Sequence, residues 1–89
     1  MPFALICTDK PGHLQVRVDT RSAHLDYIAR TGVVMMAGPF LADGAMNGSL
    51  IVLDVADLAA AQAWAANDPY AAAGLFEKVE IREWKKVIG

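Results

Sequence analysis

Three short segments of the sequence are apolar at consecutive positions, and they constrain the fold more than any other feature. Residues 3–7 read FALIC, residues 33–36 read VVMM and residues 50–53 read LIVL. Each run is too short for a buried helix and lies near turn residues, which is typical of a β-strand. A strand in a sheet with one wet face alternates apolar and polar side chains. The three segments therefore predict a sheet that is covered on both faces.

The remaining patterns predict the element order βαββαβ. Glycine, proline and asparagine residues, alone or in pairs, mark the turns between the expected helices and strands. We expect strands at residues 2–8, 33–40, 49–54 and 75–87, and helices at about 19–31 and 57–66.

The two helices are placed by residues that commonly start and end helices. Asp19 or Thr20 is expected to cap the first helix, which ends at Gly32, so residues 9–18 are expected to form a loop. Asp54 or Asp57 is expected to cap the second helix, and the sequence Asn67-Asp68-Pro69 stops it. The apolar faces are expected to consist of Leu25, Ile28 and Ala29 on the first helix and of Leu58, Ala61 and Trp64-Ala65 on the second.

The connections between strands carry their own signals. Asp43-Gly44 and Asn47-Gly48 are expected to lie between the second and third strands, so that Ser49 opens the third. Residues 70–74 are expected to form a short turn or helical piece. In the last strand the apolar side shifts at Trp84, which predicts a bulge or bend near Glu83.

Two helices of this size cover one face of a four-stranded antiparallel sheet, which is the ferredoxin-like α+β fold. With 89 residues we expect a single domain, residues 1–89. The composition is 55% hydrophobic and only 20% charged, so the chain has little left to cover the second face of the sheet. We therefore expect a homodimer that packs sheet against sheet about a two-fold axis. The sequence does not decide whether such dimers assemble into larger oligomers.

Charge and composition exclude several classes of function. Eight basic and ten acidic residues give a net charge of −2, so the chain lacks the basic surface that binds nucleic acid or an anionic membrane. No apolar run approaches the roughly 20 residues of a membrane span, and the first residues do not resemble a signal peptide. The single cysteine, Cys7, excludes an internal disulfide. We expect a cytoplasmic protein.

Several segments, taken together, resemble the YciI-like family. They include RSAHL at residues 21–25, AGPF at 37–40, AQAW at 61–64 and NDPY at 67–70. The resemblance covers nearly the whole chain and implies a ferredoxin-like subunit in a dimeric α+β barrel, with a site around His24 and Asp68. One branch of the family consists of dehydrochlorinases of chlorinated hydroxyquinols, and the wider superfamily includes muconolactone isomerases. The resemblance thus implies elimination or isomerisation chemistry.

His24 and Asp68 are the candidate catalytic residues. The expected helix start places His24 near the first turn, where the helix dipole disfavours an imidazolium and a nearby carboxylate favours one. Asp68 follows the second helix, and the ends of antiparallel helices can meet at one edge of the sheet. Asp68 would then orient one ring nitrogen, and the other would move a substrate proton. The alternative is a hydrogen-bonded, half-buried histidine beside an aspartate that only caps a turn.

Five further residues are candidates for substrate binding, and each has a structural alternative. Arg21 could hold an anionic group at the helix start, or lie solvated on the surface. Gly38 and Pro39 could mark a close approach of the backbone to a ligand or partner, or simply end a strand. Ser49 could bind a ligand or the dyad, or complete a turn. Tyr70 could wall a cavity, or pack over a helix end.

No metal and no cofactor are expected. His13 could be drawn together with His24 and Asp68 as a metal site, but a loop histidine is usually exposed and the spacing matches no known set of ligands. No glycine-rich phosphate loop or dinucleotide fingerprint is present. Cys7 is expected to be a small buried apolar residue, since nothing near it in sequence would lower its pKa.

Two hypotheses of function follow. The first is a small cofactor-independent enzyme that uses His24 and Asp68 for general acid/base chemistry, elimination or isomerisation, on a small cyclic or aromatic organic molecule. The alternative is a non-catalytic dimer that binds a small molecule or a protein partner, with a structural His–Asp pair.

Overall fold

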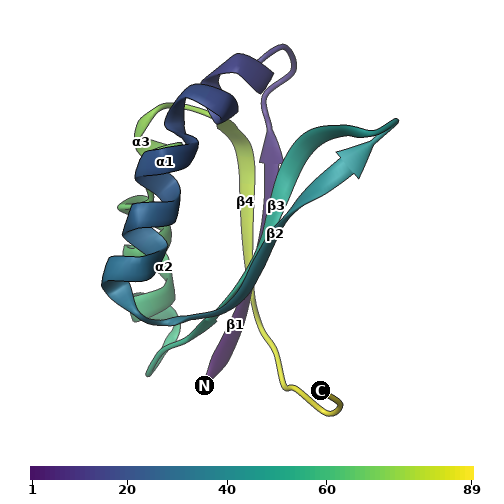
Figure 1. The fold of residues 1–89 in the computed structure, drawn as a ribbon. Coiled ribbons are helices and arrows are strands. Elements are labelled where there is room, and N and C mark those ends of the chain that lie inside the picture. Colours follow the sequence, from purple (N-terminus) through teal and green to yellow (C-terminus); the bar gives the residue numbers. More distant parts are fainter.

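The computed structural model describes all 89 residues and has the ferredoxin-like α+β fold. The sheet has the strand order β2-β3-β1-β4, and neighbouring strands are antiparallel. The helices lie on one side of it (Figure 1), and none is long and apolar enough to span a membrane. The elements are β1 (Pro2–Asp9), α1 (Leu14–Thr31), β2 (Val34–Ala42), β3 (Ala45–Asp54), α2 (Leu58–Ala66), α3 (Pro69–Ala72) and β4 (Phe76–Glu83).

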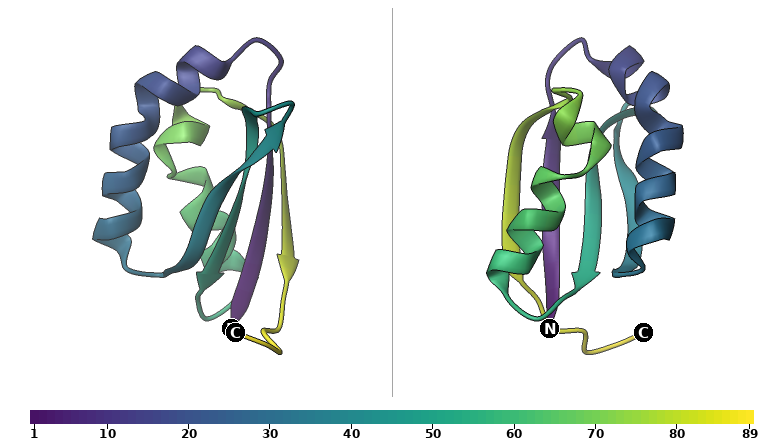
Figure 2. Two further views of the ribbon diagram at one scale, coloured as in Figure 1. Left: turned by 45° about the vertical axis from the view of Figure 1, so that its right-hand side comes forward. Right: turned by 90° about the vertical axis from the view of Figure 1, so that its left-hand side faces the viewer.

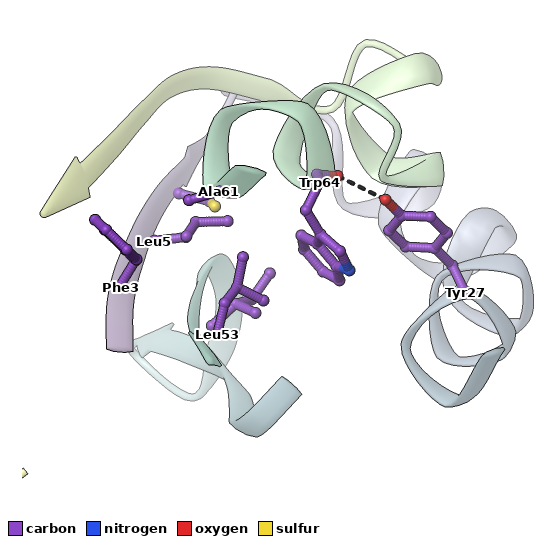
Figure 3. Packing of buried hydrophobic residues seen from close by; sticks show 8 residues of the cluster. Phe3, Leu5, Tyr27, Leu53, Ala61 and Trp64 are labelled. Carbon is purple, nitrogen blue, oxygen red and sulfur yellow. Dashed lines mark hydrogen bonds between the residues drawn. The ribbon is translucent and has the colours of Figure 1, made fainter. Parts of the chain in front are cut away.

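The hydrophobic core lies between the helices and the inner face of the sheet. Figure 2 shows α2 and α3 in front of β1 and β4, with α1 on the β2 side. The Tyr27 hydroxyl donates to the backbone oxygen of Trp64 at 2.8 Å and ties α1 to α2 (Figure 3). A buried hydroxyl needs such a partner, because an unpaired one costs about 1–3 kcal/mol. The core consists of Phe3, Leu5, Cys7, Tyr27, Ile51, Leu53, Ala61 and Trp64.

Several helix ends agree with the sequence-based expectations. Gly32 ends α1 in the left-handed conformation, with φ at 66°, which glycine adopts without strain. Asp57 caps α2 by accepting a hydrogen bond from the backbone N–H of Ala60 at 2.8 Å. The short turn or helical piece expected at residues 70–74 is α3, which begins at Pro69 and has Asp68 as its N-cap.

The first helix is longer than predicted. It starts at Leu14, so the expected loop shrinks to residues 10–13, and Asp19 and Thr20 lie inside the helix. Its N-cap residue, His13, makes no capping hydrogen bond through its side chain, which is why no capping signal marks this start. The expected apolar stripe is also wrong, since Leu25 is 50% exposed and only Ile28 packs against the core. The buried residues of α1 are Arg17, His24 and Tyr27.

The connection between β2 and β3 is shorter than predicted. Only Asp43-Gly44 forms the turn, and Asn47-Gly48 lies within β3, so Ser49 is not at a strand start. A Cβ on Gly48 would collide with the backbone oxygen of Cys7 on the neighbouring strand. The glycine is therefore explained by close strand packing rather than by a turn.

The last strand is also shorter than predicted. It ends at Glu83 instead of Val87, and residues 84–89 leave the sheet (Figure 1). The expected bulge near Glu83 is wrong, because the register shift lies at the other end of the strand. There Asp9 pairs with Phe76 and Thr8 with Lys78, so Glu77 has no partner. In the second helix, Leu58 is 47% exposed, although the sequence placed it toward the core.

The outer face of the sheet is apolar over three of its four strands. Since Phe3, Leu5 and Cys7 point into the core, strand alternation turns the residues between them outward. Met36 and Phe40 on this face are 47% and 40% exposed. By register, the apolar outer residues are Ala4, Ile6, Met36, Phe40, Leu50 and Val52, and β4 adds Lys78, Glu80 and Arg82. The apolar character of both faces, predicted from the three runs, is confirmed.

Cys7 is expected to be unreactive in the folded protein. It is 2% exposed, and burial, with the charge of Asp68, raises its pKa from 9.0 to about 12. The thiol therefore stays protonated at pH 8, and iodoacetamide should modify it only after unfolding, as measured by mass spectrometry. Because the unfolded thiol loses its proton first, stability should fall as the pH rises from about 9 toward about 12. The Cys7→Ala variant should lack this component, and alkylation of the folded chain at the unfolded rate would contradict the prediction.

Candidate active site

A cavity of about 220 Å³ lies between α1, the β2–β3 part of the sheet and α3. Six of the seven predicted site residues line it: Arg21, His24, Gly38, Pro39, Ser49 and Tyr70. The seventh, Asp68, does not line the cavity but hydrogen-bonds His24. The other lining residues are Arg17, Leu25, Ile28, Ala37 and Met46.

One stripe of α1 forms the most polar wall of this cavity. Arg17, Arg21, His24, Leu25 and Ile28 are spaced by four, three, one and three residues, which places them on one helix face. The helix thus turns an arginine–histidine edge toward the cavity. Arg21 is exposed, and it lies in the second turn of α1 rather than at the helix start. The free backbone N–H groups at the start of α1 are therefore too far away to bind an anion together with Arg21, contrary to the sequence-based expectation.

His24 and Asp68 are in direct contact. His24 Nδ1 lies 2.8 Å from Asp68 Oδ1, across 44 residues of sequence, because α3 packs beside α1 (Figure 1). The two residues are 6% and 1% exposed. His24 is the eleventh of 18 residues in α1, so the expected influence of the helix N-terminus on its ring is wrong. The carboxylate is the polar group that acts on the ring here.

The contact leaves the two ring nitrogens of His24 in different environments. A carboxylate at Nδ1 accepts the ring N–H, so a neutral ring carries its lone pair on Nε2. Nε2 makes no hydrogen bond to the protein, and no buried side-chain nitrogen lacks a partner. Nε2 is therefore accessible, and His24 lines the cavity. A group placed in this way can take a proton from a molecule in the cavity or give one to it.

Asp68 is held in place by a second contact. Its Oδ1 also accepts the backbone N–H of Tyr70 at 3.0 Å, as the N-cap of α3. Pro69 follows at the first position of the helix, where proline is preferred. The turn that caps α3 thus holds the carboxylate toward His24. Asp68 is therefore a helix cap and His24 is a hydrogen-bonded histidine, as the structural alternative in the sequence analysis expected, and the same geometry also forms the predicted pair.

Tyr70 walls the site as an aromatic platform. Its ring stacks on that of His24 with a centroid distance of 3.9 Å and an interplanar angle of 18°. The guanidinium carbon of Arg17 lies 4.8 Å from the centroid of the same ring. Burial raises the pKa of Tyr70 above its usual value, and the charge of Arg17 partly offsets this. The phenol therefore stays protonated at neutral pH and can donate a hydrogen bond.

Arg17 and Asp9 are functional candidates that sequence reasoning missed. Arg17 donates to both Asp9 oxygens, from Nε and Nη2, at 2.8 Å each, and from Nη2 to Ser49 Oγ at 2.9 Å. Burial lowers the pKa of Arg17, but the hydrogen bonds and charge of Asp9 raise it overall. Ser49, a candidate for contact with the dyad, contacts Arg17 instead. Once α1 starts at Leu14, the four-residue spacing from Arg17 to Arg21 is the signal that would have revealed Arg17.

The metal site that was weighed as an alternative is not formed. His13 is separate from the cavity wall, and its Nδ1 contacts the backbone oxygen of Pro11 at 2.9 Å. No three histidine, cysteine, aspartate or glutamate side chains come together as a set of metal ligands.

Comparison with known proteins gives consistent matches over nearly the whole chain. The YCII-related domain model matches residues 1–85. Protein YciI of Escherichia coli is 37% identical over 97 aligned positions, which cover 98% of this chain and 99% of the relative. The solved 5-chloro-2-hydroxyhydroquinone dehydrochlorinase of Burkholderia phenoliruptrix, in complex with 2,5-dihydroxybenzoquinone, is 33% identical with a TM-score of 0.90, over 96% of this chain and 94% of that one. An antibiotic biosynthesis monooxygenase, 9% identical with a TM-score of 0.61 over 98% of each chain, shares the fold alone.

Proposed function

The chain belongs to the family of YCII-related domains, and from this premise we propose that it is a small cofactor-independent enzyme. Its reaction is proton transfer linked to elimination or isomerisation, with His24 as general acid/base and Asp68 as the residue that orients it. One observation carries the proposal. Asp68 binds Nδ1 of His24 and leaves Nε2 open to a cavity.

The size and lining of the cavity favour a small cyclic substrate. A volume of about 220 Å³ is below the roughly 300–1,000 Å³ of sites for drug-sized ligands, so a single ring fits best. The aliphatic side chains of Leu25 and Ile28 and the Pro39 ring offer apolar contacts. The similar dehydrochlorinase was solved with a hydroxylated quinone, which is a molecule of this size and shape.

For a chlorinated hydroxyquinol the proposed chemistry balances without an oxidant. A ring hydroxyl loses its proton to Nε2 of His24, its electron pair forms a C=O bond, and the carbon that bears chlorine gains a proton. Loss of a second hydroxyl proton then forms another C=O bond and expels chloride. The net change is loss of HCl from a triol to give a hydroxyquinone. For an unsaturated lactone the same histidine would move a proton from one carbon to another, and for an enol it would move a proton from oxygen to carbon.

The proposal includes a homodimer formed through the outer face of the sheet. Met36, Phe40 and Leu50 on that face are apolar, and the helices on the inner face cannot cover them. An exposed patch of this kind is typical of an interface, and a second copy covers it symmetrically. Sedimentation at micromolar concentration should give twice the 9.5 kDa chain mass. A folded particle of the single-chain mass would exclude this part of the proposal.

The test of the proposed activity is turnover by the purified protein without added metal or cofactor. Hydroxyquinols with and without chlorine, lactones and enols would be assayed by chloride release, quinone absorbance and deuterium uptake from solvent. We expect HCl loss or isomerisation of at least one compound. Saturable binding of these compounds without turnover would overturn the proposed activity and would favour the non-catalytic binding module.

A further inference from the structure

We infer that the cavity selects substrates that are already ionised at a ring oxygen, and that Arg17, assisted by Arg21, binds this oxygen. The inference rests on the proposed function, because it names the charge state of the molecule on which His24 acts. It starts from a buried arginine that the proposed acid/base chemistry does not use.

Arg17 is built into the site as a fixed donor. Its side chain is 4% exposed, and that of Asp9 is 5% exposed. A guanidinium has five N–H donors, and the contacts with Asp9 and Ser49 use Nε and Nη2. None of these contacts uses Nη1, which is not a buried nitrogen without a partner, and the Tyr70 hydroxyl is a further polar partner of the guanidinium. Because Arg17 lines the cavity, the remaining donors of this rigid group are available to a molecule bound there.

The hydrogen-bond donors around the cavity line its wall, whereas the carboxylates that bind these donors lie on their far side, away from the cavity. The lining includes two arginines and a histidine, but no aspartate or glutamate. Asp9 lies behind Arg17, and Asp68 lies behind His24. Each carboxylate therefore fixes a donor without presenting its own charge to the cavity. Arg21, at the exposed side of the same wall, forms no ion pair within 4.0 Å with an acidic group.

This arrangement fits an anion better than a neutral phenol. Charge-assisted hydrogen bonds from a guanidinium to an oxyanion are about twice as strong as neutral ones, and Arg21 leaves the cavity wall with an unbalanced positive charge. The Tyr70 phenol from α3 and the Ser49 hydroxyl from β3 add polar groups to the cavity lining. A substrate ionised at one oxygen would bind with that oxygen at Arg17. Its next acidic hydrogen would then be left for His24, which divides binding and proton transfer between two residues.

The experiment compares binding of two single-ring ligands, without turnover. The hydroxyls of 2,5-dihydroxybenzoquinone are vinylogous acids and are ionised at neutral pH, whereas the phenols of hydroquinone stay protonated. We expect the parent protein to bind the ionised ligand at least about tenfold more tightly. Arg17→Lys should weaken binding of the ionised ligand by about 10- to 100-fold, because lysine lacks the planar fork.

Arg21→Gln keeps the inference testable if Arg17→Lys does not fold. It should weaken binding of the ionised ligand by about two- to fivefold, an effect that added salt reduces. Neither variant should change hydroquinone binding by more than about twofold, by the same ion-pair argument. The matched control is Arg30→Gln, since Arg30 lies on the same helix beside Tyr27 and outside the cavity. Its affinity for both ligands should equal that of the parent.

The outcomes separate this inference from the proposed function. Equal affinity of the parent for both ligands, or an Arg21→Gln variant that binds the ionised ligand as the parent does at low salt, would overturn the inference. Turnover of neutral compounds by such a protein would leave the proposed function intact. Arginine-dependent binding of the ionised ligand without any turnover would overturn the proposed activity and leave the inference standing.

Discussion

Replacing His24 with asparagine is expected to lower kcat/KM by about 10²- to 10⁴-fold, the usual contribution of a positioned general acid/base. The asparagine amide can still donate a hydrogen bond toward Asp68 from about the place of Nδ1, but it has no counterpart of Nε2. The variant therefore removes the atom proposed to transfer the proton and preserves a contact between α1 and the start of α3. Steady-state rates on any compound that the parent turns over would measure the loss.

The chain supplies its own matched control, because it has only two histidines. His13→Asn changes a residue outside the cavity whose ring contacts Pro11, and it should leave kcat/KM unchanged. Asp68→Asn should also lower the rate, since an amide can donate as well as accept and no longer fixes the proton on Nδ1. Asparagine is a good N-cap residue, so this variant keeps the cap of α3. Parent-level rates in both His24→Asn and Asp68→Asn would exclude the dyad as the catalyst.

The contact between His24 and Asp68 could be anticipated from the sequence even though the helix boundaries were wrong. Pro69 restricts the chain after Asp68, and the order βαββαβ brings both helices to one face of the sheet. These features depend on topology and on a local turn, and neither depends on where α1 starts. The reasoning about the helix dipole did depend on that start, and it failed because α1 starts six to seven residues earlier, so that His24 lies about two turns further along than expected.

The role of Arg17 could not be anticipated, because neither the start of α1 nor the residue type at this position marks it as buried. The helix start at His13 has no side-chain cap, so the first turn of α1 carries no sequence mark. The inward face of that turn is occupied by an arginine, which statistics place on the surface. Asp9 is the residue that makes its burial tolerable, and it comes from the end of a strand. A pairing between a strand end and a helix start is a tertiary property that periodicity alone does not reveal.

The error in β4 has a related cause. Its sequence alternates, and Trp84 and Val87 suggest further strand, but the ladder between β1 and β4 ends at the pair of Phe3 with Glu83, and only the backbone N–H of Trp84 continues it, by donating to the Pro2 oxygen. The length of a strand is set by its neighbours as much as by its own residues. The strands at the three apolar segments, residues 3–7, 33–36 and 50–53, were easier to predict. A short segment that is apolar at every position has few alternatives to a buried strand.

Replacing Asp9 with alanine is expected to lower the free energy of unfolding by about 3–5 kcal/mol, because it leaves the buried guanidinium of Arg17 without its counter-charge. The pair is nearly inaccessible and joined by two hydrogen bonds of 2.8 Å. Urea unfolding at one fixed protein concentration would measure the change, since the stability of the proposed dimer would depend on concentration. The double variant Asp9→Ala with Arg17→Met should recover most of the loss, because apolar residues replace a buried ion pair at little cost.

The exposed ion pair between the N-terminal amine and Asp54 provides the comparison. Its atoms lie 3.0 Å apart, but the Asp54 side chain is 66% exposed, and Asp54→Ala should cost no more than about 1 kcal/mol. The contrast between the two aspartates isolates burial as the cause, since both accept from a cation at hydrogen-bond distance. A loss at Asp9 no larger than that at Asp54 would show that water reaches Arg17 in solution. In that case the arginine would not be the rigid, desolvated donor on which selection of an ionised ring depends.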